Sequence, residues 1–286
     1  MLPTSLQAHA KSLALAIIGL ASSSAPGLAD DLQKQSQNPV ASLISLPFET
    51  SANFDVGPSE KMAYNTLIKP VYPVELTENF NLINRVIAPV VYIEGQDIAP
   101  PPGSSFELGG SEIFPGTSSE FGLGNIQYQA FFSPAQPGDW IWGVGPAFEL
   151  PTNTDSKLGS DTWSAGVAAV ALRIQGNWVY GLLLQNIWDV ASESGEPDVN
   201  RATVQPILNY NLPNGWYLTA GTTMSANWEA DSGEEWTVPL GGGVGRLVRF
   251  GKQPVDFKLV AYDNVEKPEF GADWTLQFTV KMLFPK

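Results

Sequence analysis

Cysteine is absent from the 286 residues, and the single histidine is His9. Without cysteine, the chain has no disulfide bond, no thiolate nucleophile and no cysteine-ligated metal. Without a histidine after His9, most of the chain lacks the base of serine–histidine hydrolases and the imidazole ligands of zinc enzymes. We therefore predict no enzyme, no cofactor and no metal site. A serine–lysine or a carboxylate-only mechanism remains an open alternative.

Long apolar runs and positive charge are also scarce. Hydrophobic residues make up 43% of the chain, yet no run after the N-terminal region approaches the ~18–20 residues of a membrane-spanning helix. Only 15% of the residues are charged, and 29 acidic residues outnumber 15 basic ones, for a net charge of -14. Nucleic-acid binding needs clustered lysine and arginine, so we exclude that function. The length suits one barrel or one large sandwich domain.

The N-terminus has the pattern of an export signal. Lys11 precedes a short apolar run, Ser12 to Ala21, and Gly27-Leu28-Ala29 places small residues before Asp30. The run is too short to span a membrane as a helix. We predict a secretory signal peptide over residues 1–29 and a flexible or loosely docked periplasmic lead-in over 30–40. Residues 41–286 would then form an outer-membrane barrel.

The last segment, Asp273 to Lys286, shows the clearest strand pattern. Thr275, Gln277, Thr279 and Lys281 alternate with apolar side chains, which are Trp274, Leu276, Phe278, Val280, Met282 and Phe284. Neighbouring side chains on a strand point to opposite faces, so this strand has one apolar and one polar face. Transmembrane strands need about 9–11 residues and carry aromatic residues near both interfaces, whereas soluble strands average about 5–6 residues. The pattern therefore favours a strand that faces lipid.

The same alternation recurs along the chain and divides it into about twelve strands. The clearest hairpin has Pro213-Asn214-Gly215 as its turn, between two runs of alternating residues. Short turns at residues 77–79, 133–139, 175–177, 213–215 and 251–253 alternate with longer, more acidic loops. An even strand number, with short turns at one end and long loops at the other, is typical of outer-membrane barrels. We predict an all-β, transmembrane, antiparallel up-and-down barrel with both termini in the periplasm.

Three other features have simple interpretations. Residues 94–120 form the longest irregular stretch, which we interpret as an extracellular loop because such loops are uncommon in compact soluble domains. The acidic groups at 193–198 and 231–235 lack the spacing of an EF-hand. We interpret them as solvated loop acids that divalent ions bridge to lipopolysaccharide, with calcium binding as the alternative. Gly241 to Arg246 is glycine-rich but lacks the context of a phosphate loop, so we assign it to a strand.

Seven charged residues fall on the polar face of their strands and would point into the lumen. They are Glu49, Lys69, Arg85, Glu149, Asp256, Lys258 and Lys281. One interpretation is a charged constriction that selects solutes. The other is a set of interior ion pairs that fills the lumen. Barrels of about eight strands fill their interior and those of 16–18 leave a channel, so twelve strands predict a narrow or plugged pore.

Several short segments resemble a bacterial family of predicted outer-membrane transporters. Its members are often labelled "neuromedin U" or phenol-degradation meta-pathway protein. The resemblance lies in Asn38 to Pro47, Pro70 to Pro73, Asn81 to Arg85 with Pro89-Val90, and Leu283 to Lys286. It implies an outer-membrane barrel that passes small, hydrophobic or aromatic solutes, and it brings no catalytic residue.

We accordingly expect an outer-membrane channel or transporter for small solutes. The alternative is a structural or binding barrel with a filled lumen and functional extracellular loops. The expected partners are outer-membrane lipid, lipopolysaccharide, the barrel-assembly machinery and small solutes, with no nucleic acid.

Overall fold

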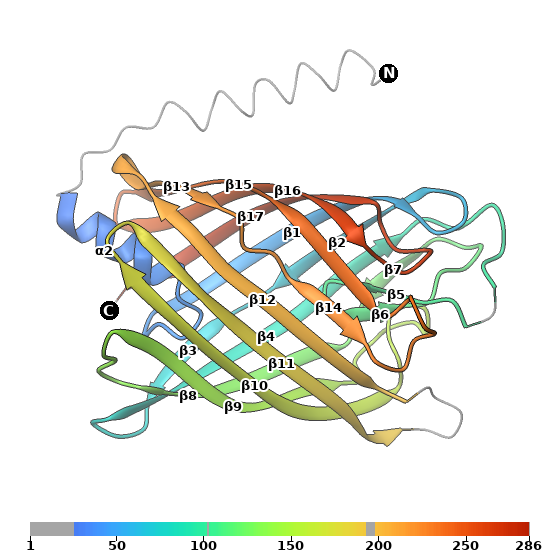
Figure 1. Cartoon of the computed structure of the whole chain (residues 1–286), viewed down its shortest axis with the longest axis horizontal. Coiled ribbons are helices and arrows are strands. Elements are labelled where there is room, and N and C mark those ends of the chain that lie inside the picture. The colour runs from blue at the N-terminus through green and yellow to red at the C-terminus, as the bar shows by residue number, and fades with distance from the viewer. Residues whose placement is uncertain (1–25, 102, 193–197, 286) are drawn as a thin grey trace, which may run out of the picture.

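The computed structural model describes residues 26–101, 103–192 and 198–285. Its main feature is a closed antiparallel β-barrel of twelve strands, three of which are interrupted (Figure 1). In chain order the barrel strands are β1 (Ile44–Val56), β2 (Lys61–Ile68) continued by β3 (Val71–Glu75), β4 (Phe80–Ile93), β7 (Glu120–Leu123) continued by β8 (Ile126–Pro134), β9 (Trp140–Leu150), β10 (Thr162–Gln175), β11 (Trp178–Ser192), β12 (Asn200–Asn211), β13 (Trp216–Thr219) continued by β14 (Met224–Asn227), β15 (Trp236–Phe250), β16 (Gln253–Glu266) and β17 (Trp274–Phe284).

Pairing of the first and last strands closes the barrel. β1 runs antiparallel to β17, in an unbroken register from Ile44 opposite Phe284 to Phe54 opposite Trp274. Strands that are neighbours in sequence pair all the way round, including β11 with β12. The predicted all-β, up-and-down, twelve-stranded barrel is therefore confirmed. Closure leaves no free sheet edge.

The outer surface of the barrel is apolar. Val167, Leu184 and Leu259 are 57%, 44% and 47% exposed. Exposed aromatic residues lie near both ends of the strands, and they include Phe80, Trp140, Trp178 and Phe250 at one end and Trp163, Trp188, Trp228 and Trp274 at the other. Soluble monomers rarely expose a continuous apolar surface of this kind. An apolar band between two aromatic girdles is the surface that a bilayer covers.

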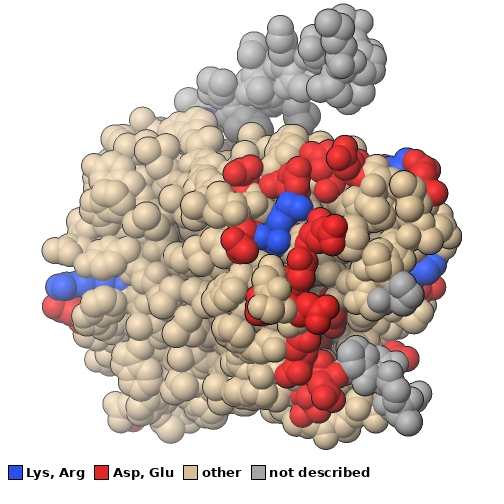
Figure 2. All heavy atoms as spheres, turned by 45° about the vertical axis from the view of Figure 1, so that its right-hand side comes forward, with Lys and Arg blue, Asp and Glu red and all other residues tan. Residues whose placement is uncertain are grey.

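The two ends of the barrel differ. The five short turns lie at one end, here called the turn end. The other end, here called the loop end, has the longer connections and one further short turn at residues 57–60. The C-terminus lies at the turn end (Figure 1). Acidic side chains gather near the loop end (Figure 2). Within the described ranges, no helix is long and apolar enough to cross a membrane.

A helix packs at the turn end, where the sequence led us to expect a flexible or loosely docked lead-in. Helix α2 (Pro26–Ser36) buries Leu32 and Gln33, and Leu32 clusters with Leu43 and Leu283. The Gln33 side-chain amide donates a hydrogen bond to the Trp216 carbonyl at 2.8 Å. The segment around 30–36 is therefore held by specific contacts. Residues 1–25, most of the predicted signal peptide, lie outside the described residues.

The long stretch at 94–120 is not wholly an outer loop. It contains a short hairpin, β5 (Phe106–Leu108) and β6 (Ser111–Ile113), that is separate from the barrel sheet. Phe106, Leu108 and Ile113 are buried against the inner side chains of β1, β2 and β4. The prediction of an ordinary extracellular loop is therefore corrected, because this apolar hairpin folds inward.

One side of the lumen is filled by apolar packing. Inward-facing side chains from β4 and β8–β12 form a single buried cluster, which includes Ile83, Phe131, Ala168, Val170, Leu172, Val179 and Leu183. In β10 both faces are therefore apolar: one face is exposed on the outside of the barrel and the other packs in this cluster. Open space remains beside this cluster, and polar inner residues of β1, β12, β16 and β17 line much of it.

The glycine-rich segment from Gly241 lies in β15, as the sequence predicted. Gly245 pairs with Tyr217 across the sheet, and a Cβ at Gly245 would lie 2.1 Å from the Tyr217 ring. The missing side chain lets the tyrosine lie flat against the inner wall. The glycines here serve barrel packing, and no phosphate loop is formed.

Candidate functional site

Two cavities lie in series inside the barrel. The one toward the turn end has a volume of about 160 Å³ and is lined partly by Ser36 at the end of α2. The one toward the loop end has a volume of about 200 Å³ and is lined partly by the β5–β6 hairpin. Both are bordered by the same residues, which we call the shared layer: Glu49, Lys69, Arg85, Gln205, Gly221 and Lys258.

Charged side chains dominate the shared layer. Lys69 Nζ lies 2.7 Å from Glu49 Oε1, a close ion pair, whereas Lys258 Nζ lies 3.8 Å from Glu49 Oε2. The Arg85 guanidinium lies 5.9 Å from the centre of the Phe131 ring. Among the described residues, no group accepts a hydrogen bond from Arg85 Nη1. The layer therefore holds three cations and one anion.

A second group of charges lines the turn-end cavity. Lys281 Nζ lies 3.7 Å from Asp256 Oδ2 and donates a hydrogen bond to the Ser36 carbonyl at 2.8 Å. The Tyr217 hydroxyl donates to Asp256 at 3.0 Å. Lys281 thus joins the last strand to the end of α2, so the position of the helix depends on a lumen charge.

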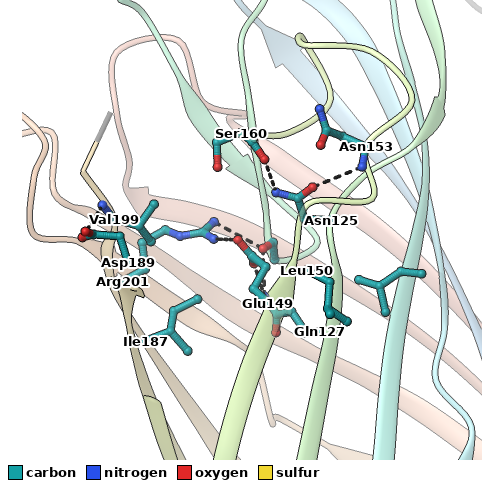
Figure 3. A network of polar contacts seen from close by, with 12 residues as sticks. Asn125, Gln127, Glu149, Leu150, Asn153, Ser160, Ile187, Asp189, Val199 and Arg201 are labelled. Carbon is teal, nitrogen blue, oxygen red and sulfur yellow. Dashed lines mark hydrogen bonds and ion pairs between the residues drawn. The ribbon is translucent and has the colours of Figure 1, made fainter. Parts of the chain in front are cut away.

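Glu149 lies apart from the other six candidates, near the loop end. It is fully buried, and it forms an ion pair with Arg201, which comes from a strand that does not neighbour β9 (Figure 3). Gln127 Nε2 donates a second hydrogen bond to Glu149 at 2.9 Å. Gln127 and Arg201 also donate to the Gly110 carbonyl, at 3.0 Å and 3.4 Å. This network ties the tip of the hairpin to two separate walls of the barrel.

The hairpin adds an acid of its own to the loop-end cavity. Glu107 lines this cavity, and burial raises the pKa of its carboxyl group, an effect that the nearby Arg201 charge and a hydrogen bond from Ser225 partly oppose. The loop-end cavity is therefore bordered by Glu107 on the hairpin side and by the cationic shared layer on the other.

Six of the seven predicted residues border the two cavities, and the structure places Glu149 in the separate hairpin network. The sequence interpretation missed Arg201, Glu107 and Tyr217. Arg201 and Tyr217 had a usable signal, since each alternates with outward-facing residues of its strand. Glu107 had none, because nothing in residues 94–120 indicates that they fold inward. A pore role for these side chains stays a prediction.

Comparisons with known proteins concern the fold. No family model and no curated protein matches the chain. Among solved structures, the COG4313 outer membrane channel from Pseudomonas putida F1 is similar, with a TM-score of 0.57, 14% sequence identity, and 86% of this chain and 97% of that chain covered. The chain has the fold of an outer-membrane β-barrel. At this identity the likeness extends to the fold alone.

Weaker likenesses include a phospholipase and a FadL homologue. The outer membrane phospholipase OMPLA from Salmonella typhi has a TM-score of 0.42 and 13% identity, with 92% of this chain and 99% of that chain covered. A FadL homologue from Pseudomonas aeruginosa has a TM-score of 0.41 and 9% identity, with 85% and 90% covered. Scores this low add nothing to the functional argument.

In the described part of the chain, no group of three or more histidine, cysteine or acidic side chains is placed to hold a metal ion. Of the two acidic stretches in the sequence, residues 193–197 lie outside the described residues. In the other, Glu234 accepts a hydrogen bond from the Glu269 backbone, so it helps to connect two loops.

Proposed function

We propose that the protein is an outer-membrane channel for small solutes, including aromatic and other partly hydrophobic ones. One observation carries the proposal: two cavities lie in series along the inside of a closed barrel and meet at a layer of charged side chains. A barrel that served only as a scaffold would gain from filling this space. Buried charges lining open space are costly unless ions, water or solute meet them.

The proposal includes the setting of the barrel. An exported chain reaches the outer membrane, the assembly machinery inserts it, and lipid covers its apolar band. Lipopolysaccharide meets the acidic loop end, and both termini lie on the periplasmic side. The route would run from the loop end past the hairpin, through the shared layer, and out beside α2. No catalytic step is part of this function.

A second candidate function is a structural or binding barrel with a filled lumen. The observation in its favour is the amount of interior packing. The β5–β6 hairpin and the apolar cluster around Phe131 occupy the lumen, and helix α2 packs at its turn end. In that case the two cavities would hold bound water or ligand and would conduct nothing.

Planar-bilayer recording on purified protein separates the two candidates. We expect small, resolvable single-channel steps, because the cavities are narrow and partly obstructed. Release of a one-ring aromatic solute from loaded liposomes should also be faster with the protein than without it. An absence of both conductance and solute release, from protein whose gel mobility still shifts on boiling, would contradict the channel.

A further inference from the structure

The shared layer carries a local excess of positive charge, which Asp256 of the turn-end cavity offsets only in part. It contributes Lys69, Arg85 and Lys258 against the single acid Glu49, in a chain whose net charge is -14. Most acids therefore lie elsewhere, and many gather at the loop end (Figure 2). Exposed acids act through water and are screened within about 8 Å at physiological ionic strength. They do not cancel the local field inside the barrel.

The pairing within the layer shows which cations remain available. Lys69 Nζ forms a close ion pair with Glu49 Oε1 at 2.7 Å. Lys258 Nζ lies 3.8 Å from Glu49 Oε2, which is beyond ordinary hydrogen-bond length. Arg85 Nη1 is buried and has no acceptor among the described residues. A buried donor without a partner loses its hydration and gains nothing in return. Arg85 and Lys258 are therefore the two groups to which an incoming anion would add the missing contacts.

Apolar surface adjoins these two cations. Leu67, Ile87 and Leu183 line the loop-end cavity together with Arg85 and Lys258. Leu183 belongs to the same apolar cluster as Phe131, and the Arg85 guanidinium lies over the Phe131 ring. A ligand with one anionic group and one small apolar body matches this arrangement. A bare inorganic ion would leave the apolar wall uncovered.

We propose that the shared layer is a binding site for small organic carboxylates, with the carboxylate on Arg85 and Lys258 and the apolar body against Leu67, Ile87 and Leu183. A guanidinium matches a carboxylate with two parallel hydrogen bonds, which an ammonium cannot form. As a step in transport, the site rests on the proposed channel function; as a binding site, it does not. Neutral aromatic solutes would meet only the apolar half of it.

Equilibrium binding to the purified barrel in detergent tests the proposal. Calorimetric titration would compare benzoate with benzamide, which has nearly the same shape and no charge. We expect benzoate to bind roughly tenfold or more tightly, because charge-assisted hydrogen bonds are about twice as strong as neutral ones. Arg85→Gln and Lys258→Gln should each weaken benzoate binding roughly tenfold and leave benzamide binding unchanged. Arg85→Lys keeps the charge but loses the planar guanidinium. Its affinity for benzoate should lie between those of Arg85→Gln and the unaltered protein.

Lys252→Gln is the matched control, since it removes one positive charge from an exposed turn outside both cavities. It should leave both affinities unchanged. Equal affinity for benzoate and benzamide, or unchanged benzoate binding in folded Arg85→Gln and Lys258→Gln barrels, would overturn the site. Selective benzoate binding by a barrel that conducts nothing would support the site while contradicting the channel. Conductance without selective benzoate binding would support the channel while contradicting the site.

Discussion

Removing the β5–β6 hairpin is expected to raise the single-channel conductance severalfold. The hairpin fills the loop end of the lumen with Phe106, Leu108 and Ile113, and its tip is held by Gln127 and Arg201 on separate walls. A variant in which residues 105–113 are replaced by a short Gly-Ser link keeps every barrel strand. The obstruction would then be gone and the barrel closure unchanged.

A deletion at the same end provides the control for this experiment. Asp231 and Ser232 lie in an exposed loop outside both cavities, so their removal should leave the conductance unchanged. Both variants must first show the gel shift of a closed barrel on boiling. If the hairpin variant then conducts no better than the unaltered protein, the hairpin does not obstruct the route.

Breaking the buried Glu149–Arg201 pair should produce the largest loss of stability of any single substitution at the charged sites described above. Glu149 and Arg201 side chains are 1% and 7% exposed, and each also holds the hairpin network. Arg201→Met leaves the Glu149 charge buried without its partner, which costs about 3–5 kcal/mol. Urea unfolding in lipid vesicles, followed by tryptophan fluorescence, measures the change in free energy.

The exposed pair between Arg173 and Asp139 is the natural comparison. Its atoms are 3.0 Å apart, but the side chains are 33% and 82% exposed. Arg173→Met should therefore cost less than about 1 kcal/mol. The double variant Glu149→Gln with Arg201→Met should lose less free energy of unfolding than the sum of the two single variants. The reason is that each single change leaves a buried partner unsatisfied. Additive losses would show that the two side chains act independently.

The barrel could be predicted from local sequence patterns. Alternation in β17 and the turn at 213–215 set strand faces and hairpins without any long-range information. Residue type on the polar face led us to expect charges such as Glu49 and Lys258 in the lumen, and their role in a pore stays a prediction. The barrel prediction succeeded because side-chain alternation along each strand separates an inner from an outer face.

The features that the sequence did not predict depend on contacts between distant segments. The inward fold of β5–β6 needs the apolar wall of β1, β2 and β4 and the donors Gln127 and Arg201, and none of these is near it in sequence. The docking of α2 likewise depends on Trp216 and Lys281. The separation of Glu149 from the shared layer reflects strand register and tilt, which alternation alone does not set.

The absence of cysteine allows a direct test of the central claim, that the lumen past the shared layer is a continuous aqueous route. Gln205→Cys places a single thiol between the two cavities, and Leu184→Cys places one on the outer surface of the neighbouring strand. We predict that a charged, membrane-impermeant thiol reagent changes the conductance of Gln205→Cys from either side of the bilayer and leaves Leu184→Cys unaffected. A Gln205→Cys barrel that conducts but reacts from neither side would contradict the account.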